Sequence, residues 1–369
     1  MSPNDNDAGI STLVGFTFGD WLQLLKDNHL SLSLTYRKRW LPIFFLSLRN
    51  SQLRSKEVKK FGDEIDAAVI QPPIFVIGHW RSGTTLLHSL LAVDDRFSYP
   101  NLFQVTFPHT FLTLREMFAE RMEAEDDAEK RPMDNMEVRY DSPGEDEFAL
   151  AVLSLRSPVI GWMFPRRQDV YDRYLTFRDV SEADIDIWRS AFSAFLKKLS
   201  IGHNKPLILK SPQHTARIRL LLDMFPDARF VHICRHPFDV FRSTQKLYRT
   251  AVANNRVQTA SDENVDDDII RRYREMYDAY LEEHSLIPAG HHYQIHFEDL
   301  EKDMMGQVRA IYEHLDLPDF DVVEPKLQDY IDSMSGYKKN KHRPLSDSMK
   351  RRLAEAWRPM FDAFGYDPE

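Results

Sequence analysis

The chain has 369 residues, of which 43% are apolar and 28% charged, as is usual for a soluble globular protein. The formal net charge of −9 argues against general nucleic-acid binding, which needs a basic face, so a site for an anion must be built locally. The single cysteine, Cys234, excludes an internal disulfide and indicates a reducing compartment, and we therefore expect a cytoplasmic protein.

Residues 1–70 are predicted to form a helical N-terminal extension. The first ten residues are polar and lack the basic start of a signal peptide. The longest apolar run near the start, LPIFFLSL at 41–48, is too short to span a bilayer, which takes about 20 residues. With the basic YRKRW before it, this run could touch a membrane surface peripherally, but a buried amphipathic helix is the simpler interpretation.

Residues 71–369 are predicted to form one α/β domain. Four short apolar runs, each followed by a helical pattern, are expected to be strands: 74–78, 206–210, 229–235 and 292–297. This alternation is typical of a parallel sheet covered by helices on both faces, in which ligands bind beyond the carboxyl ends of the strands. We therefore expect a P-loop-like, three-layer α/β/α fold and look for function at the strand ends.

The first strand is followed by a loop with the spacing of a phosphate-binding loop, GHWRSGTT at 78–85. Its glycines allow a tight turn, and the helix that follows directs backbone amides and its dipole at an anion. A nucleoside-triphosphate loop would have lysine at position 84, where this chain has threonine. The residues that we expect to bind the phosphate are Trp80, Arg81, Ser82, Gly83, Thr84 and Thr85.

The next two strands end in cations, Lys210 and Arg235. A magnesium-dependent kinase or nucleotidase needs a carboxylate at a strand end to hold its metal, so this pattern predicts a phosphate ligand bound without a metal. Ser243 follows Arg235 by eight residues, on the next helix, and the pair predicts a second anion site. The later pair Glu298 and Asp299 is expected to cap a helix. Two anion sites on one sheet edge predict a ligand with two separated phosphate-like groups.

The two motifs, GHWRSGTTLL and FVHICRHPFDVFRST, resemble the nucleotide signatures of the sulfotransferases that use 3′-phosphoadenosine 5′-phosphosulfate (PAPS). The segment LKSPQHTARIRLLLDMFPDARF resembles the prokaryotic-type branch, and the resemblance covers roughly residues 72–250. It implies that the first loop holds the 5′-phosphosulfate and that Arg235 and Ser243 hold the 3′-phosphate. By the same resemblance, the basic segment 335–347 closes over the 3′-phosphate, with contacts from Tyr337, Lys339 and Asn340.

The resemblance further implies metal-independent, in-line transfer of a sulfuryl group to a hydroxyl of a small or medium, partly apolar acceptor, with 3′-phosphoadenosine 5′-phosphate (PAP) as the product. Two positions depart from the best-known cytosolic members. Arg81 stands where they have lysine, which keeps the charge but changes the donor geometry. Leu86 stands where they have the tryptophan that stacks on adenine, so the adenine must stack elsewhere.

Transfer to an alcohol needs a base for the hydroxyl proton and cations for the charge on the leaving phosphate. Arg81 and Lys210 suit the second role. The candidates for the base are Glu145 and Glu147, in SPGEDEFAL, and His214, four residues after Lys210. Ser142 and Glu145 also have capping-box spacing, and Glu147 would point about 200° around the helix from Glu145. The acidic cluster is favoured over His214, and the choice within it stays open.

Two other functions compete with sulfuryl transfer. One is a P-loop kinase or nucleotidase that requires magnesium, and the other is a nucleotide-binding scaffold without activity. Aromatic residues in segments 101–118 and 158–178 could line an acceptor pocket or belong to the core. The acceptor and the oligomeric state are open at this point.

Overall fold

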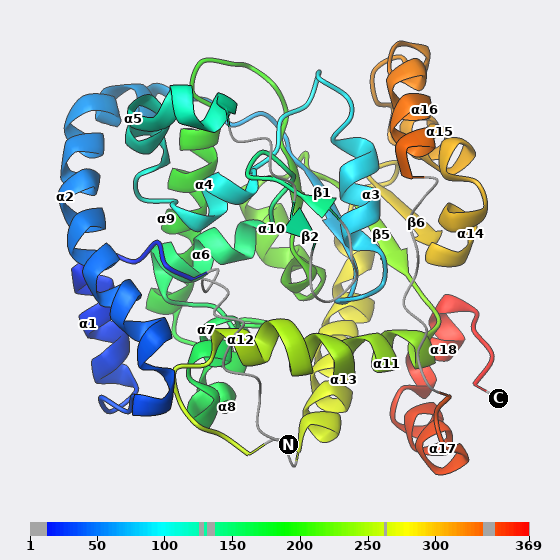
Figure 1. Ribbon diagram of the computed structural model, residues 1–369. Helices are drawn as coiled ribbons and strands as arrows, with labels where there is room; N and C mark the ends of the chain where they lie inside the picture. Colours follow the sequence, from blue (N-terminus) through cyan, green and yellow to red (C-terminus); the bar gives the residue numbers. More distant parts are fainter. Residues whose placement is uncertain (1–12, 125–128, 131–136, 262–263, 335–343, 369) are drawn as a thin grey trace.

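A parallel four-stranded sheet forms the centre of the computed structural model, which describes residues 13–124, 129–130, 137–261, 264–334 and 344–368 (Figure 1). Its strands are β1 (Ile74–Ile77), β4 (Ile208–Lys210), β5 (Arg229–Cys234) and β6 (His292–His296), in the order β4-β1-β5-β6. All three pairings are parallel. The α/β class expected from the sequence is therefore confirmed.

Helices make up most of the remaining described chain. They are α1 (Phe18–Asp27), α2 (Arg37–Ala67), α3 (Thr84–Leu91), α4 (Leu102–Thr106), α5 (Phe111–Ala124), α6 (Asp146–Ser154), α7 (Ile160–Met163), α8 (Gln168–Asp172), α9 (Glu182–Leu199), α10 (Ile218–Met224), α11 (Pro237–Leu247), α12 (Ala253–Asn255), α13 (Val265–Glu283), α14 (Phe297–Lys302), α15 (Met304–His314), α16 (Glu324–Ser333), α17 (Asp347–Ala356) and α18 (Arg358–Phe364). A second, antiparallel pair of short strands is formed by β2 (Glu129–Lys130) and β3 (Glu137–Val138).

The two faces of the sheet belong to two separate apolar cores. Phe75 and Ile77 of β1 lie in the larger core, together with residues of α6, α9, α10, α11, α13 and α18. Ile74 and Val76 lie in the smaller one, with residues of α3, α14, α15 and α16. This alternation follows from the two-residue period of a strand. Because both faces are covered, ligands can reach the sheet only at its ends.

The N-terminal helices pack against the larger core, on the side of the molecule away from β6 (Figure 1). Trp21 and Leu24 of α1 and Ile43 of α2 are fully or almost fully buried there. Among the described residues, no helix combines the length and the apolar character needed to cross a bilayer. The boundary near residue 70 stays a prediction.

Helix α6 begins later than the capping-box spacing of Ser142 and Glu145 predicts, and that prediction is wrong. The helix begins at Asp146, with Glu145 as the residue before it. The preceding backbone instead bonds the loop before α4: Leu102 N–H donates to the Ser142 carbonyl at 3.0 Å, and Gly144 N–H donates to the Pro100 carbonyl at 2.7 Å. These bonds flank an isolated antiparallel bridge between Asn101 and Pro143.

Phe75 tests how far the sheet depends on its central strand. Replacing it with alanine leaves a cavity between two neighbouring strands and α9, and we expect a loss of about 3–5 kcal/mol in the free energy of unfolding. Phe45, an exposed phenylalanine of α2, is the matched control, and Phe45→Ala should change stability by less than about 0.5 kcal/mol. Chemical denaturation measures both, and equal losses would contradict this assignment of the core.

Candidate active site

The loop between β1 and α3 has the strained geometry of a tight anion-binding turn. Gly78, Arg81 and Gly83 have φ angles of 145°, 71° and 100°. A Cβ at Gly78 would lie 2.3 Å from the Ile233 carbonyl oxygen, and one at Gly83 would lie 2.3 Å from Cδ2 of Phe297. Both glycines are therefore required by close packing as well as by their backbone conformation.

Ser82 and His79 hold this loop in shape. The Ser82 hydroxyl donates to the His79 carbonyl at 2.7 Å, and its backbone N–H donates to the same oxygen at 3.1 Å. Burial lowers the pKa of His79 to about 4, so its ring is neutral at pH 7. Gly83 forms the N-cap of α3 without a side-chain cap among the described residues. Thr84 and Thr85 open that helix, where the dipole and amides favour an anion.

The two predicted anion sites lie next to each other. Arg81 Nε donates to the Ser243 hydroxyl at 2.9 Å, and Arg235 Nη1 donates to the Arg81 carbonyl at 3.3 Å. Ser243 is buried on α11, and Arg235 follows β5 directly. Residues more than 150 positions apart in the chain thus converge beyond the ends of β1 and β5. A single ligand with two charged groups can reach both sites.

Three consecutive acidic residues at the start of α6 pair with three basic residues at and after the end of β4. Glu145 pairs with Lys210, Asp146 with His214 and Glu147 with Arg217. The first of these pairs also contacts the start of α3, because Lys210 Nζ lies 2.6 Å from Glu145 Oε1 and 3.3 Å from Thr85 Oγ1. The Lys210 side chain is almost fully buried, whereas Glu145 retains some exposure.

Glu147 and His214 face the interior instead. Glu147 accepts two hydrogen bonds from Arg217, at 2.6 and 3.0 Å, and one from the Ser157 hydroxyl at 2.6 Å. His214 is fully buried, its ring packs against Phe75 and Phe192, and its Nε2 lies 2.5 Å from Asp146 Oδ2. Both side chains are therefore buried and engaged with partners in the core.

The pairing of Asp146 with His214 is strongly electrostatic. Burial on its own raises the pKa of the Asp146 carboxyl, but the electrostatic interaction and hydrogen bond with His214, together with hydrogen bonds from Ser211 and its own backbone, outweigh this effect, so the pKa lies below its usual value. The carboxylate stays ionised inside the core, and the pair fixes the first turn of α6 against the 3₁₀ turn Pro212–Ala216. The neighbouring Glu145 is positioned by that turn.

Phe297 is a residue of the site that the sequence analysis missed. It is the first residue of α14, directly after β6, and its half-buried ring lies against Gly83. The guanidinium carbon of Arg235 lies 4.4 Å from the centre of this ring. The available signal was an aromatic residue at the end of the fourth strand. The next residue, Glu298, accepts from His236 N–H and from the Tyr366 hydroxyl.

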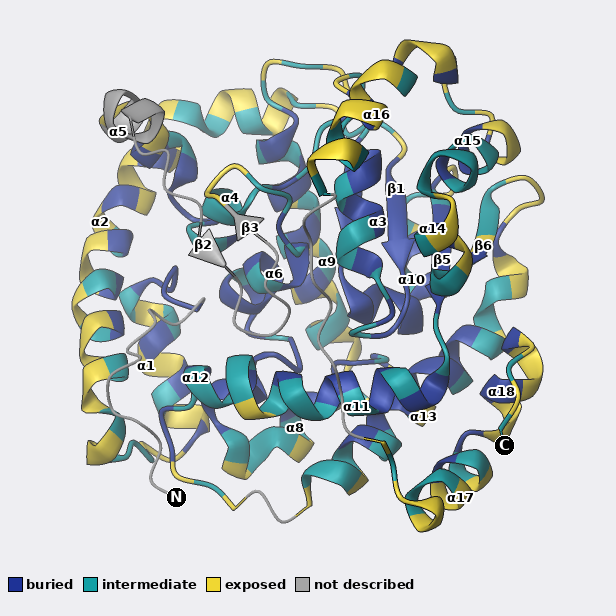
Figure 2. Ribbon diagram, turned by 45° about the vertical axis from the view of Figure 1, so that its right-hand side comes forward, coloured by how far each residue is buried: buried dark blue, intermediate teal, exposed yellow. Residues whose placement is uncertain are grey.

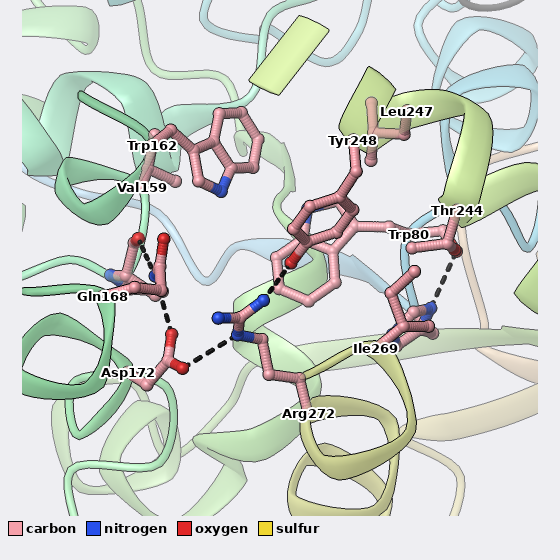
Figure 3. A pocket seen from close by; sticks show the side chains of 12 residues that line it. Trp80, Val159, Trp162, Gln168, Asp172, Thr244, Leu247, Tyr248, Ile269 and Arg272 are labelled. Atoms are coloured by element: carbon pink, nitrogen blue, oxygen red, sulfur yellow. Dashed lines mark hydrogen bonds and ion pairs between the residues drawn. The ribbon is translucent and has the colours of Figure 1, made fainter. Parts of the chain in front are cut away.

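Trp80, a residue of this loop, lines a small cavity of about 20 Å³, room for about one water molecule (Figure 3). Trp162 and Tyr248 form further aromatic parts of its lining. Its polar end is a buried pair in which Arg272 Nε donates to Asp172 at 2.8 Å. Other aromatic residues of segments 101–118 and 158–178 are core, including Phe111, Phe164, Tyr171, Tyr174 and Phe177. The core interpretation thus holds for these residues, and Trp162, which lines the cavity, belongs to the same core. That the two segments line an acceptor pocket stays a prediction.

Tyr337, Lys339 and Asn340 lie outside the described residues. Within the described part of the chain, no group of three or more His, Cys, Asp and Glu side chains is arranged to hold a metal ion. The phosphate loop is thus bordered by two groups of side chains. On one side lie Thr85, Lys210 and Glu145, and on the other lie Ser243, Arg235 and Phe297.

Comparisons with known proteins agree with this arrangement. A model of the sulfotransferase family matches residues 72–321. The omega-hydroxy-beta-dihydromenaquinone-9 sulfotransferase Stf3 of Mycobacterium bovis and that of Mycobacterium tuberculosis are each 36% identical to this chain over 358 residues, covering 96% of this chain and 91% of theirs.

Two solved structures share the fold. Sulfotransferase STF9 from Mycobacterium avium has a TM-score of 0.67 at 17% identity, with 99% of both chains covered. Sulfotransferase STF1 from Mycobacterium tuberculosis has a TM-score of 0.63 at 19% identity, with 95% of this chain and 94% of that chain covered. Because the family model spans well over half of the chain and the curated relatives match nearly all of it, this chain belongs to the sulfotransferase family and is a sulfotransferase.

Proposed function

We propose that this enzyme transfers a sulfuryl group from PAPS to a hydroxyl of a partly apolar, lipid-like acceptor, without a metal ion. The observation that carries this proposal is the direct contact between the two anion sites, through Arg81, Ser243 and Arg235. PAPS has a phosphosulfate and a separate 3′-phosphate, and a ligand of that kind fits two adjacent cationic sites on one sheet edge.

Each part of the donor has a proposed partner. The amides at the start of α3, Thr84, Thr85 and Arg81 bind the phosphosulfate, whereas Arg235 and Ser243 bind the 3′-phosphate. The ring of Phe297 lies between the loop and Arg235. It offers the adenine an aromatic surface in place of the tryptophan that other members have at the position of Leu86. Contacts from Tyr337, Lys339 and Asn340 remain a proposal that rests on the resemblance.

Glu145 is the proposed base among the three candidates. It retains some exposure, and a single lysine separates it from the loop, whereas Glu147 and His214 are occupied inside the core. As the acceptor oxygen attacks sulfur, its proton passes to Glu145 and the bond from sulfur to the bridging phosphate oxygen breaks. Lys210 and Arg81 compensate the charge that develops on the departing PAP. Asp146, Glu147, His214 and Arg217 act as positioning residues.

The acceptor class rests on the curated relatives, which act on omega-hydroxy-beta-dihydromenaquinone-9 according to their names. We propose that this enzyme also sulfates an alcohol with a large apolar part. The aromatic cavity beside Trp80 adjoins the loop, but its volume of about 20 Å³ does not hold such a group, so the acceptor class rests on the relatives alone. The cytoplasm remains the proposed compartment. Burial raises the pKa of the Cys234 thiol to about 12, which identifies it as a core residue rather than a reactive one.

Thermal shift measurements separate this proposal from a kinase or nucleotidase. PAP should raise the melting temperature, because it occupies both anion sites, and ATP with magnesium should raise it much less.

Ser243→Ala should weaken PAP binding about tenfold or more, since a hydrogen bond to a charged phosphate is lost. Ser55→Ala, at an exposed helical serine, is the matched control. Stabilisation by ATP with magnesium but not by PAP would refute the proposal.

Glu145→Gln tests the base. We expect kcat to fall by about 10²–10⁴-fold, because the proton acceptor is lost, while PAP binding changes little. The assay follows transfer of labelled sulfate from PAPS to a panel of long-chain and prenyl alcohols. Full activity in a folded Glu145→Gln variant, together with loss of activity in a folded His214→Asn variant, would assign the base to His214. A wild-type protein that binds PAP but transfers no sulfate to any alcohol would instead favour the inactive scaffold.

For Glu147→Gln we expect a loss of stability, in contrast to the loss of kcat expected for Glu145→Gln. It leaves Arg217 buried without its charged partner, and we expect the free energy of unfolding to fall by about 3–5 kcal/mol. Chemical denaturation measures this loss. If Glu147→Gln instead kept the wild-type stability and abolished turnover, Glu147 and not Glu145 would be the catalytic carboxylate.

A further inference from the structure

An exposed apolar surface lies at the start of α2 and in the turn before it. It is formed by five large side chains, which we call the leucine face. They are Leu30, Leu34, Leu41, Phe45 and Leu48, with 71%, 75%, 38%, 64% and 40% of their surface exposed. Figure 2 shows exposed residues along this helix, on the outer side of the molecule. The expectation that the run 41–48 forms a helix is confirmed, but much of the run is not buried.

The spacing of three of these residues places them on one side of α2. Leu41, Phe45 and Leu48 are separated by four and three residues, so their side chains lie above one another on α2. Ile43 and Ser47, on the inner side, are buried. The inner side thus satisfies packing against the core, and folding alone does not require large apolar side chains on the outer side.

Leu30 is held outward by the backbone. It has a φ of 53° and follows His29 at 56°, a left-handed conformation that leucine seldom adopts. A backbone hydrogen bond of 2.7 Å from Leu30 N–H to the Leu25 carbonyl closes this turn. The chain therefore keeps a strained turn at a position where the leucine side chain gains little from packing.

The leucine face is firmly attached to the rest of the protein. Arg39 Nη1 donates to the Ala253 carbonyl at 2.7 Å, and Ser33 N–H donates to the Val257 carbonyl at 3.0 Å. Arg166 Nη1 donates to the Ser31 hydroxyl at 3.2 Å. Arg166 lies between α7 and α8, whose residues line the aromatic cavity. The leucine face thus adjoins α7 and α8, whose residues line the cavity beside the phosphate loop.

The charge of the segment that carries this surface is opposite to that of the whole protein. Residues 26–49 contain one acidic residue, Asp27, and five basic ones: Lys26, Arg37, Lys38, Arg39 and Arg49. The chain as a whole has a net charge of −9. Arg37 and Lys38 are exposed, next to Leu34 and Leu41. A second copy docked through the same surface would bring these like charges together, whereas an anionic surface complements them.

We propose that the leucine face docks onto an anionic lipid bilayer. The leucine and phenylalanine side chains enter the boundary of the acyl chains, and Arg37 and Lys38 bind the headgroup phosphates, as in amphipathic helices that lie on membranes. A lipid-like acceptor would then be available beside α7 and α8. The docking goes beyond the proposed reaction and does not depend on it, since it needs neither donor nor acceptor.

The test is co-sedimentation of the full chain with vesicles. We expect binding to vesicles of phosphatidylcholine mixed with phosphatidylglycerol, much weaker binding to phosphatidylcholine alone, and release by salt. Arg37→Gln with Lys38→Gln should weaken binding about tenfold or more, since each cation near an anionic surface contributes about fivefold. The charge control is Lys302→Gln with Arg351→Gln, at exposed positions outside this surface.

A second pair of variants tests the apolar part. Leu34→Ser with Phe45→Ser should also weaken binding about tenfold, whereas Val69→Ser with Val322→Ser, at equally exposed valines elsewhere, should not. Unchanged melting temperatures verify folding. The proposal is overturned if the wild-type chain ignores anionic vesicles or if the leucine-face variants bind as well as their controls. It is also overturned if Leu34→Ser with Phe45→Ser converts a dimer into a monomer in light scattering, because a second copy would then cover the surface. None of these results would bear on whether the enzyme transfers sulfate from PAPS.

Discussion

The parallel register of β4, β1 and β5 is the constraint on which the site depends. Val76 lies opposite Lys210 and Val231, so the three strands end at nearly the same level. This places the loop of β1 between Lys210 on one side and Arg235 on the other. The loop, Lys210 and the two arginines thus share one scaffold. A shift of one strand by a single residue would turn Lys210 to the opposite face of the sheet.

The start of α6 is the second determinant of the site. Three acidic side chains in succession are matched by a lysine, a histidine and an arginine spaced along one stretch of chain. Buried ion pairs of this kind add little net stability but are costly to break, so their main effect is to fix geometry. Two of the pairs lock the helix to the core, and the third is left at the edge of the loop. A carboxylate held this way needs no further reorganisation to face a bound acceptor.

Much of this arrangement could be predicted from the sequence, because it depends on local patterns. The four strands, the phosphate loop and the spacing of Arg235 and Ser243 follow from short runs of residues, and the structure places them where the patterns indicate. The start of α6 could not be predicted, since Ser142 and Gly144 bond a loop some 40 residues earlier. The burial of Glu147 likewise depends on Arg217, 70 residues away. Phe297 gains its place only when β6 is set beside β5.

The hydrogen bond between Arg81 and Ser243 has a consequence for how nucleotides are told apart. Ser243, the proposed partner of the 3′-phosphate, accepts this bond from Nε of the arginine proposed to bind the sulfate. Its own proton can therefore be donated to a phosphate oxygen, while the Nη groups of the arginine are not part of this bond. A nucleotide that carries a 3′-phosphate would gain the serine hydrogen bond and one that lacks it would not. Discrimination against the other adenine nucleotides would then arise from a bond that only the 3′-phosphorylated ligand makes, with no clash against the wrong ligand.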